Sequence, residues 1–216
     1  MSVRAVIFDL DGTLLNTLED LADAGNATLK AFGYPEHPVE SYKQFVGDGV
    51  GMLVRRAMPA EHMDAYPRVL ERMREEYAKH LDCKTKPYPG IMQLLKALAS
   101  QGIALCVLSN KPEQFCQANM IQFFGGVRWA AIVGESAAIP RKPDPAGALA
   151  IAKRLGLAPE EFMFVGDSPM DVACALNAGM TPVGVTWGFR GRDTMEEAGA
   201  KLFIDKPEEL VGLLRQ

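Results

Sequence analysis

The stretch VRAVIFDLDGT, residues 3–13, joins an apolar run to a pair of acidic side chains. Residues 3–8 are apolar apart from Arg4, as expected of a strand that is covered on both faces of a parallel sheet. Asp9 and Asp11 follow directly, and residues two apart in an extended chain face the same side. Two carboxylates so close repel each other, so one must take a proton or both must share a cation. The stretch therefore predicts a buried strand that ends in a functional site.

The composition of the 216 residues is typical of a globular protein, with 48% hydrophobic and 23% charged residues. A net charge of −4 argues against general nucleic-acid binding, which needs a basic face. No apolar stretch reaches the ~20 residues of a membrane helix. The first strand begins within three residues, which leaves no room for a signal peptide, and the four cysteines lack metal-ligand spacing. We therefore expect reduced thiols and a cytoplasmic location.

Short apolar runs predict the strands of one sheet. The runs are residues 3–8, 103–108, 130–133, 162–165, 182–185 and 202–204. From residue 90 onward, apolar stripes at helical spacing lie between them, and Gly102 and Gly156 end two of these stripes. Alternation of strand and helix implies right-handed parallel crossovers. We predict an α/β core with a doubly wound, Rossmann-like and mainly parallel sheet.

Residues 16–86 interrupt this alternation, because they contain no strong strand candidate. They contain helical patterns at residues 17–33, with Thr17 as the expected cap, at residues 50–58, and at residues 67–81. A structureless loop of this length would be unusual in a compact domain, so an inserted helical cap domain is the better interpretation. The predicted division is a core of residues 1–15 and 87–216 and a cap of residues 16–86.

Polar clusters stand near the ends of four predicted strands. They are residues 9–13, 109–112, 141–145 and 166–171. Ligands of open α/β sheets bind beyond the carboxyl ends of the strands, so these clusters should converge. Each cluster alone could be a turn, a helix cap or, for Lys142, a solvated surface lysine. Because their order and their strand-end positions agree, we favour one shared site.

The residue types in these clusters suit phosphoryl transfer. Oxygen ligands without a His/Cys cluster favour Mg²⁺ over zinc. One carboxylate beside the metal can attack phosphorus, and a second can protonate the leaving group and then activate water. Lys142, Ser109 and backbone N–H groups can bind the phosphate oxygens. Asp167 would complete the metal shell, and Asp171 could ligate through water or orient Lys142.

Four motifs occur in a set order along the chain. They are Asp9-x-Asp11-x-Thr13, Ser109, Lys142 and Gly166-Asp167-x-x-x-Asp171. This set resembles the haloacid dehalogenase superfamily, and the helical insertion resembles the cap of that superfamily. Two further stretches resemble its phosphoglycolate phosphatase branch. They are Ser109-Asn110-Lys111-Pro112 and Phe45-Val46-Gly47-Asp48-Gly49.

The resemblance implies a role for each motif residue. Asp9 would be the nucleophile and Asp11 the general acid and base, with Lys142 as the catalytic cation. The phosphoryl group would be bound by Asp9, Ser109, Asn110 and Lys142. The metal, Mg²⁺, would be held by Asp9, the Asp11 backbone carbonyl and Asp167, with Thr13 and Asp171 in support. Asp11 also favours phosphate over halide, because true dehalogenases of the superfamily lack this second acid.

Substrate choice should depend on the cap, which closes over the site and excludes water. Gly47 belongs to a glycine-rich loop whose backbone can approach a ligand. Arg55, on the following helix, could pair with a substrate carboxylate or a second phosphate. A solvated helix face is the alternative interpretation of Arg55.

These expectations describe a Mg²⁺-dependent phosphatase that forms an aspartyl phosphate on a small phosphorylated metabolite, with 2-phosphoglycolate as the best candidate. A pyrophosphatase, a nucleotide phosphatase or a sugar phosphomutase could use the same core. A non-catalytic phospho-aspartate switch is the alternative from another class, although Asp11 and the cap argue against it. The expected partner is a small phosphorylated molecule, with no nucleic acid and no membrane, and no oligomeric state is predicted.

Overall fold

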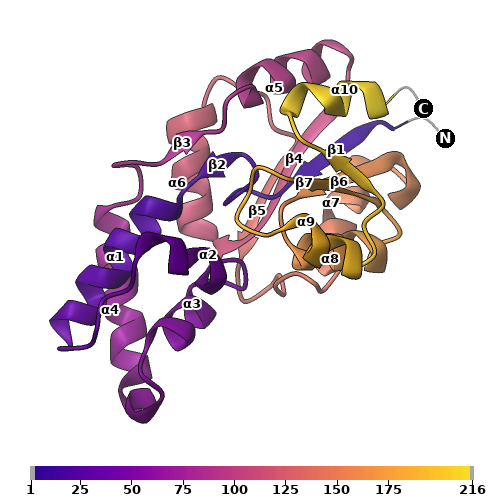
Figure 1. The fold of residues 1–216 in the computed structure, drawn as a ribbon. Coiled ribbons are helices and arrows are strands. Elements are labelled where there is room, and N and C mark those ends of the chain that lie inside the picture. Colours follow the sequence, from indigo (N-terminus) through magenta and orange to yellow (C-terminus); the bar gives the residue numbers. More distant parts are fainter. Residues whose placement is uncertain (1–2, 215–216) are drawn as a thin grey trace.

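The computed structural model describes residues 3–214 and is built around a six-stranded sheet (Figure 1). Its strands are β1 (Ala5–Phe8), β4 (Ala104–Pro112), β5 (Ala131–Glu135), β6 (Phe162–Gly166), β7 (Thr181–Val185) and β8 (Leu202–Ile204). They lie in the order β5-β4-β1-β6-β7-β8, and every neighbouring pair is parallel. The prediction of a doubly wound parallel sheet is confirmed, and the segment after β1 emerges at the middle of the sheet.

Helices cover both faces of this sheet. The helices of the core are α5 (Ile91–Ser100), α6 (Glu113–Phe124), α7 (Ala146–Leu155), α8 (Pro169–Asn177), α9 (Arg192–Glu197) and α10 (Leu210–Leu213), with 3₁₀ turns at Pro159–Glu161 and Pro207–Glu209. Val6 and Phe8 of β1 pack into the apolar cluster under α5, α6 and α10. Ala5 and Ile7 point to the opposite cluster, under α7 and α8. Because successive strand residues face opposite sides, a strand buried on both faces must be apolar throughout.

Strand β4 is longer than the predicted run of residues 103–108. It continues to Pro112, which pairs with Glu135 after a shift of register beyond Leu108. The sequence suggested a turn here, because Ser, Asn, Lys and Pro are poor strand formers. The irregular end of β4 instead places the polar side chains of residues 109–111 at the edge of the sheet.

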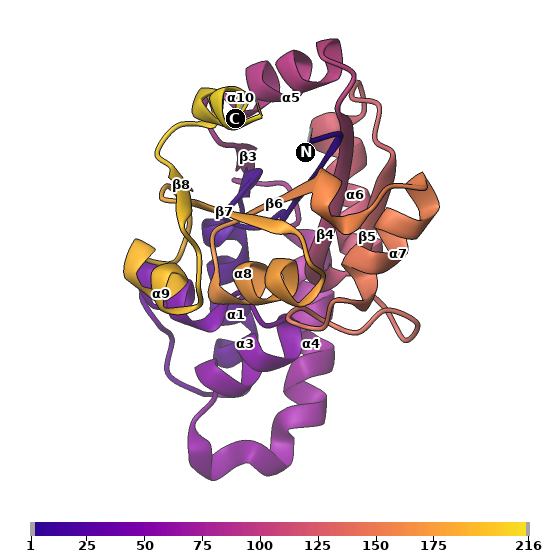
Figure 2. The ribbon, with the colours of Figure 1, turned by 90° about the vertical axis from the view of Figure 1, so that its right-hand side faces the viewer.

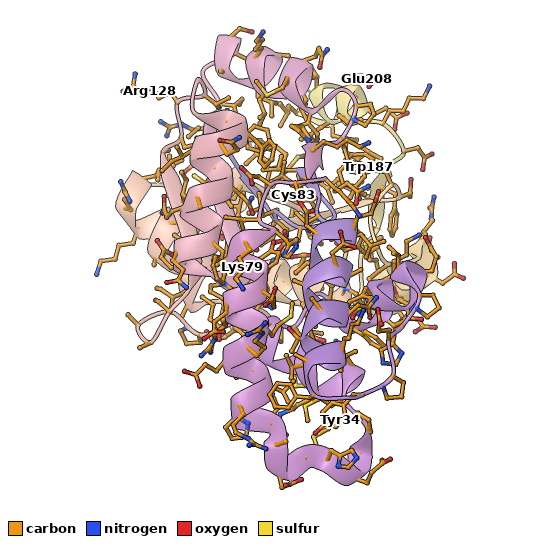
Figure 3. The ribbon with its side chains drawn as sticks, turned by 90° about the vertical axis from the view of Figure 1, so that its left-hand side faces the viewer. Tyr34, Lys79, Cys83, Arg128, Trp187 and Glu208 are labelled. Atoms are coloured by element: carbon orange, nitrogen blue, oxygen red, sulfur yellow. The ribbon has the colours of Figure 1, made fainter. Side chains whose placement is uncertain are left out.

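The helical insertion lies at one end of the molecule, away from the start of β1 and from α10 (Figures 1 and 2). Its helices are α1 (Leu18–Ala31), α2 (Tyr42–Phe45), α3 (Val50–Ala57) and α4 (Tyr66–Lys79), with 3₁₀ turns at Val39–Ser41 and Ala60–Ala65. They bury an apolar core of their own around Tyr42, Val69 and Met73. Tyr34 lies at its far tip, and Trp187 and Glu208 lie toward the sheet (Figure 3). Within residues 3–214, no helix combines the length and apolar character that crossing a bilayer requires.

Two short strands that the sequence did not predict flank the insertion. Strand β2 (Leu15–Asn16) pairs in antiparallel fashion with β3 (Lys86–Pro87), so the chain enters and leaves the insertion side by side. Thr17 precedes α1 as predicted, but its hydroxyl does not cap the helix. The Asn16 side chain accepts a hydrogen bond from the Leu18 N–H instead, at 3.3 Å.

Asp20 ties the first turn of α1 to the chain that returns to the core. Its carboxylate is buried and accepts hydrogen bonds from the backbone N–H groups of Lys84, at 2.9 Å, and Thr85, at 2.8 Å. A buried carboxylate is stable only when it is paired or hydrogen-bonded. Asp20 therefore links the two ends of the insertion by a buried contact.

Replacing Asp20 should weaken this link. Asp20→Ala leaves two backbone donors without their charged acceptor, and we expect the free energy of unfolding to fall by about 2–4 kcal/mol. Urea denaturation followed by circular dichroism measures the change. The matched control is Asp23→Ala, which removes a partly exposed carboxylate of the same helix that pairs with the Lys84 ammonium, and it should have a much smaller effect. Equal effects of the two substitutions would contradict this role of Asp20.

Candidate active site

The carboxyl ends of three adjacent strands bring the predicted motif residues together. Asp9 follows β1, Ser109 lies near the end of β4, and Asp167 follows β6. Lys142 arrives from the segment between β5 and α7. The side chains of these residues are buried although all are polar. Polar groups buried together at one sheet edge need hydrogen-bond or ion-pair partners among themselves.

Three carboxylates crowd the centre of this edge. Asp9, Asp167 and Asp171 each offer an oxygen atom, and these atoms lie within 4.8 Å of one another. Burial raises the pKa of Asp9 to about 7, with Lys142 opposing the rise and Asp171 adding to it. Burial, together with Asp9 and Asp171, raises the pKa of Asp167 to about 8. Negative charge at this edge is therefore unstable unless a cation shares it.

Lys142 supplies one positive charge to the cluster. Its Nζ lies 2.6 Å from Asp171 Oδ1 and 2.8 Å from Asp9 Oδ1. Burial alone would lower the pKa of Lys142, but these carboxylates raise it above its usual value. Asn110 holds the Lys142 backbone, because its side chain accepts from the Lys142 N–H at 2.7 Å and donates to the Lys142 carbonyl at 3.1 Å. Asn110 therefore positions the lysine from the neighbouring strand.

Asp171 is already engaged by groups of the protein. Its Oδ2 accepts from the Ser168 N–H at 3.0 Å and from the Ser168 hydroxyl at 2.6 Å, in a capping box that begins α8. Its Oδ1 accepts from Lys142. Of the two roles that the sequence left open for Asp171, these contacts favour orienting Lys142 over binding a metal through water.

Asp167 lies in a cradle that only glycine permits. A Cβ on Gly12, whose φ is +90°, would lie 2.3 Å from Asp167 Oδ2, and one on Gly188 would lie 2.2 Å from Asp167 Cβ. The Asp167 carboxylate accepts from the Phe189 N–H at 2.7 Å and from the Thr13 hydroxyl at 3.4 Å. Thr13 thus contacts Asp167, in keeping with a supporting position. The close approach of Gly188 to Asp167 depends on the path of the loop after β7 and was not predicted.

The donor set fits a divalent metal ion. Asp9 Oδ1 is buried and has no hydrogen-bond partner among the described residues, although the Lys142 ammonium is close enough to pair with it by charge. The Asp167 carboxylate stands beside it. Hard oxygen donors of this kind suit Mg²⁺, and a cation would favour the ionised form of these carboxylates, whose pKa values burial raises. The side chains of Asp9 and Asp167 therefore fit such an ion.

Asp11 lies apart from the three buried carboxylates. Its Oδ1 accepts from Lys111 Nζ at 2.8 Å, and Lys111 also donates to the Tyr77 hydroxyl of α4. The Asp11 side chain faces a cavity that is lined by residues of both the core and the insertion. The lining residues are Asp9, Asp11, Leu21, Val46, Gly47, Gly49, Val50, Leu53, Tyr77, Ser109, Asn110, Lys111 and Pro112. The cavity thus joins the acidic edge of the sheet to the insertion.

The two residues predicted to select the substrate are placed differently. Gly47 lines the cavity, and its carbonyl accepts a hydrogen bond from the Asn110 side chain at 3.1 Å. Arg55 is exposed and does not line the cavity, and its guanidinium lies 4.1 Å from the centre of the Tyr66 ring. Lys111 and Tyr77 were not predicted as site residues. Lys111 belongs to the motif Ser109-Asn110-Lys111-Pro112, which resembles the phosphatase branch. Tyr77 occupies a position in the helical pattern of residues 67–81 that is typical of an apolar core.

Comparisons with known proteins agree with this arrangement. The model of the haloacid dehalogenase-like hydrolase family matches residues 6–185. Phosphoglycolate phosphatase 1 of Pseudomonas aeruginosa is 36% identical over 215 residues, which cover 96% of this chain and 78% of that protein. The phosphoglycolate phosphatase of Chromobacterium violaceum is 34% identical over 218 residues, which cover 99% of this chain and 97% of that protein.

A solved structure supports the same assignment. A candidate phosphoglycolate phosphatase from Lactobacillus delbrueckii subsp. bulgaricus matches with a TM-score of 0.91 at 33% identity, over 99% of each chain. The family match spans most of the chain and contains the strands that carry the acidic edge. The chain therefore belongs to the haloacid dehalogenase-like hydrolase family.

Proposed function

We propose that this protein is a Mg²⁺-dependent phosphatase that hydrolyses 2-phosphoglycolate or a similarly small phosphate ester. The observation that carries the proposal is the pairing of a buried Asp9 with Lys142 beside Asp167, with Asp11 at the same cavity. Relatives named phosphoglycolate phosphatase, at about 35% identity, support the substrate. Members of the family generally depend on a metal ion and form an aspartyl phosphate.

Asp9 is the nucleophile in this proposal. Its carboxylate oxygen attacks phosphorus, the ester P–O bond breaks, and the phosphoryl group is carried on Asp9 as an acyl phosphate. Asp11 gives a proton to the departing oxygen and then takes a proton from the water that hydrolyses the acyl phosphate. Asp11 suits this task because its side chain faces the cavity rather than the acidic cluster.

Lys142 and Ser109 bind the phosphoryl oxygens. Asp171 holds the Lys142 ammonium and Asn110 holds the Lys142 backbone, so the ammonium is already in place to stabilise developing charge. The Ser109 oxygen accepts from the Lys111 N–H at 3.3 Å, which leaves its own hydroxyl proton to donate to the substrate. Asn110 acts through Lys142 and is a positioning residue.

Asp9, Asp167 and the Asp11 backbone carbonyl would hold the Mg²⁺ ion. When bound, the ion supplies positive charge that offsets repulsion between the phosphate and the attacking carboxylate. Thr13, Gly12 and Gly188 keep the Asp167 carboxylate in place.

Residues 16–86 act as a cap over this site, and the described part of the core consists of residues 3–15 and 87–214; residues 1–2 and 215–216 of the predicted core lie outside the described residues. Three core side chains donate to consecutive backbone carbonyls of the cap loop. The pairs are Arg190 to Val46, Asn110 to Gly47 and Arg141 to Asp48, at 2.8, 3.1 and 2.8 Å. These contacts hold the cap against the cavity, which favours exclusion of water and a small substrate.

The direct test is phosphate release from a panel of phosphate esters and pyrophosphate, with Mg²⁺ and with EDTA. We expect metal-dependent release that is fastest with 2-phosphoglycolate. Release of phosphate from other esters only would support the phosphatase reaction but contradict 2-phosphoglycolate as the substrate. No release from any compound, with a stable phosphoryl group on Asp9 after treatment with a small phosphodonor, would overturn the proposal in favour of a phospho-aspartate switch.

Asp9→Asn should abolish turnover, because the amide is not a nucleophile at phosphorus. We expect kcat to fall by at least about 10³-fold while the thermal unfolding curve stays cooperative. Asp193→Asn, which changes an exposed carboxylate on α9, is the matched control and should retain wild-type activity. Substantial turnover by folded Asp9→Asn protein would rule out Asp9 as the nucleophile.

The raised pKa values predict that Mg²⁺ stabilises the protein more at high pH. Without metal, a carboxyl group whose folded pKa exceeds the ordinary aspartate value of 3.8 destabilises the fold as it ionises. This loss grows as pH rises above about 4 and is complete above about 8, the pKa of Asp167. Metal binding favours the ionised carboxylates and releases protons near pH 7.

Thermal unfolding with Mg²⁺ and with EDTA, at pH 6 and at pH 8.5, measures this effect. We expect the Mg²⁺-dependent increase in Tm to be larger at pH 8.5, and to be lost in Asp167→Asn. An increase that is the same at both pH values would show that Asp9 and Asp167 do not hold the ion.

A further inference from the structure

Lys111 is a buried cation that the proposed mechanism does not use. Its side chain is 3% exposed, and it lines the cavity between core and cap. Its Nζ lies 2.8 Å from Asp11 Oδ1, donates to the Tyr77 hydroxyl, and lies 4.8 Å from the centre of the Tyr77 ring. A lysine buried at this depth is costly unless its charge is paired and its N–H donors are satisfied.

The Lys111 ammonium group has one N–H donor that is not used by the contacts described above. A lysine Nζ carries three N–H donors, and the described contacts of Lys111 use two of them, toward Asp11 and Tyr77. Burial alone would lower the pKa of Lys111, but Asp11 and Tyr77 raise it, so the group stays positively charged. A charged donor on the cavity wall is therefore available to a ligand.

No other cation lines this cavity within the described residues. Lys142 is held between Asp9 and Asp171 and is not part of the wall. The cap side of the wall is mainly apolar, with Leu21, Val46, Val50 and Leu53. Arg55 lies against Tyr66 instead. An anionic group on the part of the substrate under the cap would therefore meet Lys111 as its cationic partner.

We propose that Lys111 recognises a carboxylate on the same substrate whose phosphate reacts at Asp9. This inference rests on the proposed phosphatase function and names the feature that selects the substrate. The chemical class is a short phosphate monoester with a carboxylate close to the ester oxygen. Asp9 and Lys111 reach the same cavity from the ends of β1 and β4, so the two anionic ends of such a molecule are bound by adjacent strands.

Tyr77 makes this recognition depend on the cap. It is the cap residue that shares the Lys111 ammonium, and its ring packs edge-on against Phe115 of α6 at 5.2 Å between ring centres. The Lys111 ammonium is therefore held on one side by the core, through Asp11, and on the other by the cap. The substrate carboxylate would bind where core and cap meet.

The test compares two substrates that differ in the carboxylate alone. They are 2-phosphoglycolate and 2-hydroxyethyl phosphate, in which a hydroxymethyl group replaces the carboxylate. We expect wild-type kcat/KM to favour 2-phosphoglycolate by about 100-fold or more, because a site built for a polar group rejects the analogue that lacks it. Lys111→Met should reduce this ratio to within about 10-fold.

The ratio of the two kcat/KM values distinguishes recognition of the substrate carboxylate by Lys111 from a purely structural role of Lys111. Lys111 also contacts Asp11, so its loss is expected to slow both substrates by a common factor that cancels in the ratio. Lys30→Met, which removes an exposed lysine from α1, is the matched control and should leave the ratio unchanged. A Lys111→Met variant that loses rate equally on both substrates would show that Lys111 only positions Asp11, and would overturn the inference.

Binding of substrate analogues gives a second readout that needs no turnover. Calorimetry in Mg²⁺ should show that wild-type protein binds 3-phosphonopropionate more tightly than propylphosphonate, and that Lys111→Met or Lys111→Gln removes this difference. Equal binding of both phosphonates by wild-type protein would overturn the inference even if the variants fail to fold. Lys111-dependent binding without hydrolysis of any ester would retain the inference and overturn the proposed function.

Discussion

Burial of negative charge around one lysine is the constraint on which the rest of this structure depends. Asp9, Asp167 and Asp171 are buried together, and the Lys142 ammonium pairs with Asp9 and Asp171. Charges removed from water must be paired, so the segments that carry them cannot shift independently. The central position of β1, between β4 and β6, is what allows three different loops to meet at this lysine.

Much of this arrangement could be predicted from the sequence, because its signals are local. A strand buried on both faces must be apolar, and the run before Asp9 is apolar along nearly all its length. Two carboxylates after such a strand serve no structural purpose, so Asp9 and Asp11 predicted a site. Placement of the remaining motifs followed from the rule that parallel strands end at one edge.

What could not be predicted depends on contacts between distant residues. Tyr77 occupies a helical position that suits an apolar core, and the contact of its hydroxyl with Lys111 follows from packing of the cap on the core. Arg55 is near the glycine loop in sequence, but the buried face of α3 is formed by Leu53, Val54 and Ala57, so Arg55 points elsewhere. Strands of two residues, such as β2 and β3, have no periodic pattern to detect.

The pairing of β2 with β3 also bears on how this architecture can change. Because the chain leaves the sheet and returns to it at neighbouring points, the backbone connects the insertion to the core at a single place. A different insertion would need to match that connection and to offer backbone carbonyls to Asn110, Arg141 and Arg190, while the strands of the sheet could keep their positions. The backbone of the sheet edge can therefore stay constant in evolution while the insertion changes, whereas Lys111, which contacts Asp11 and Tyr77, couples the chemistry to whatever insertion covers it.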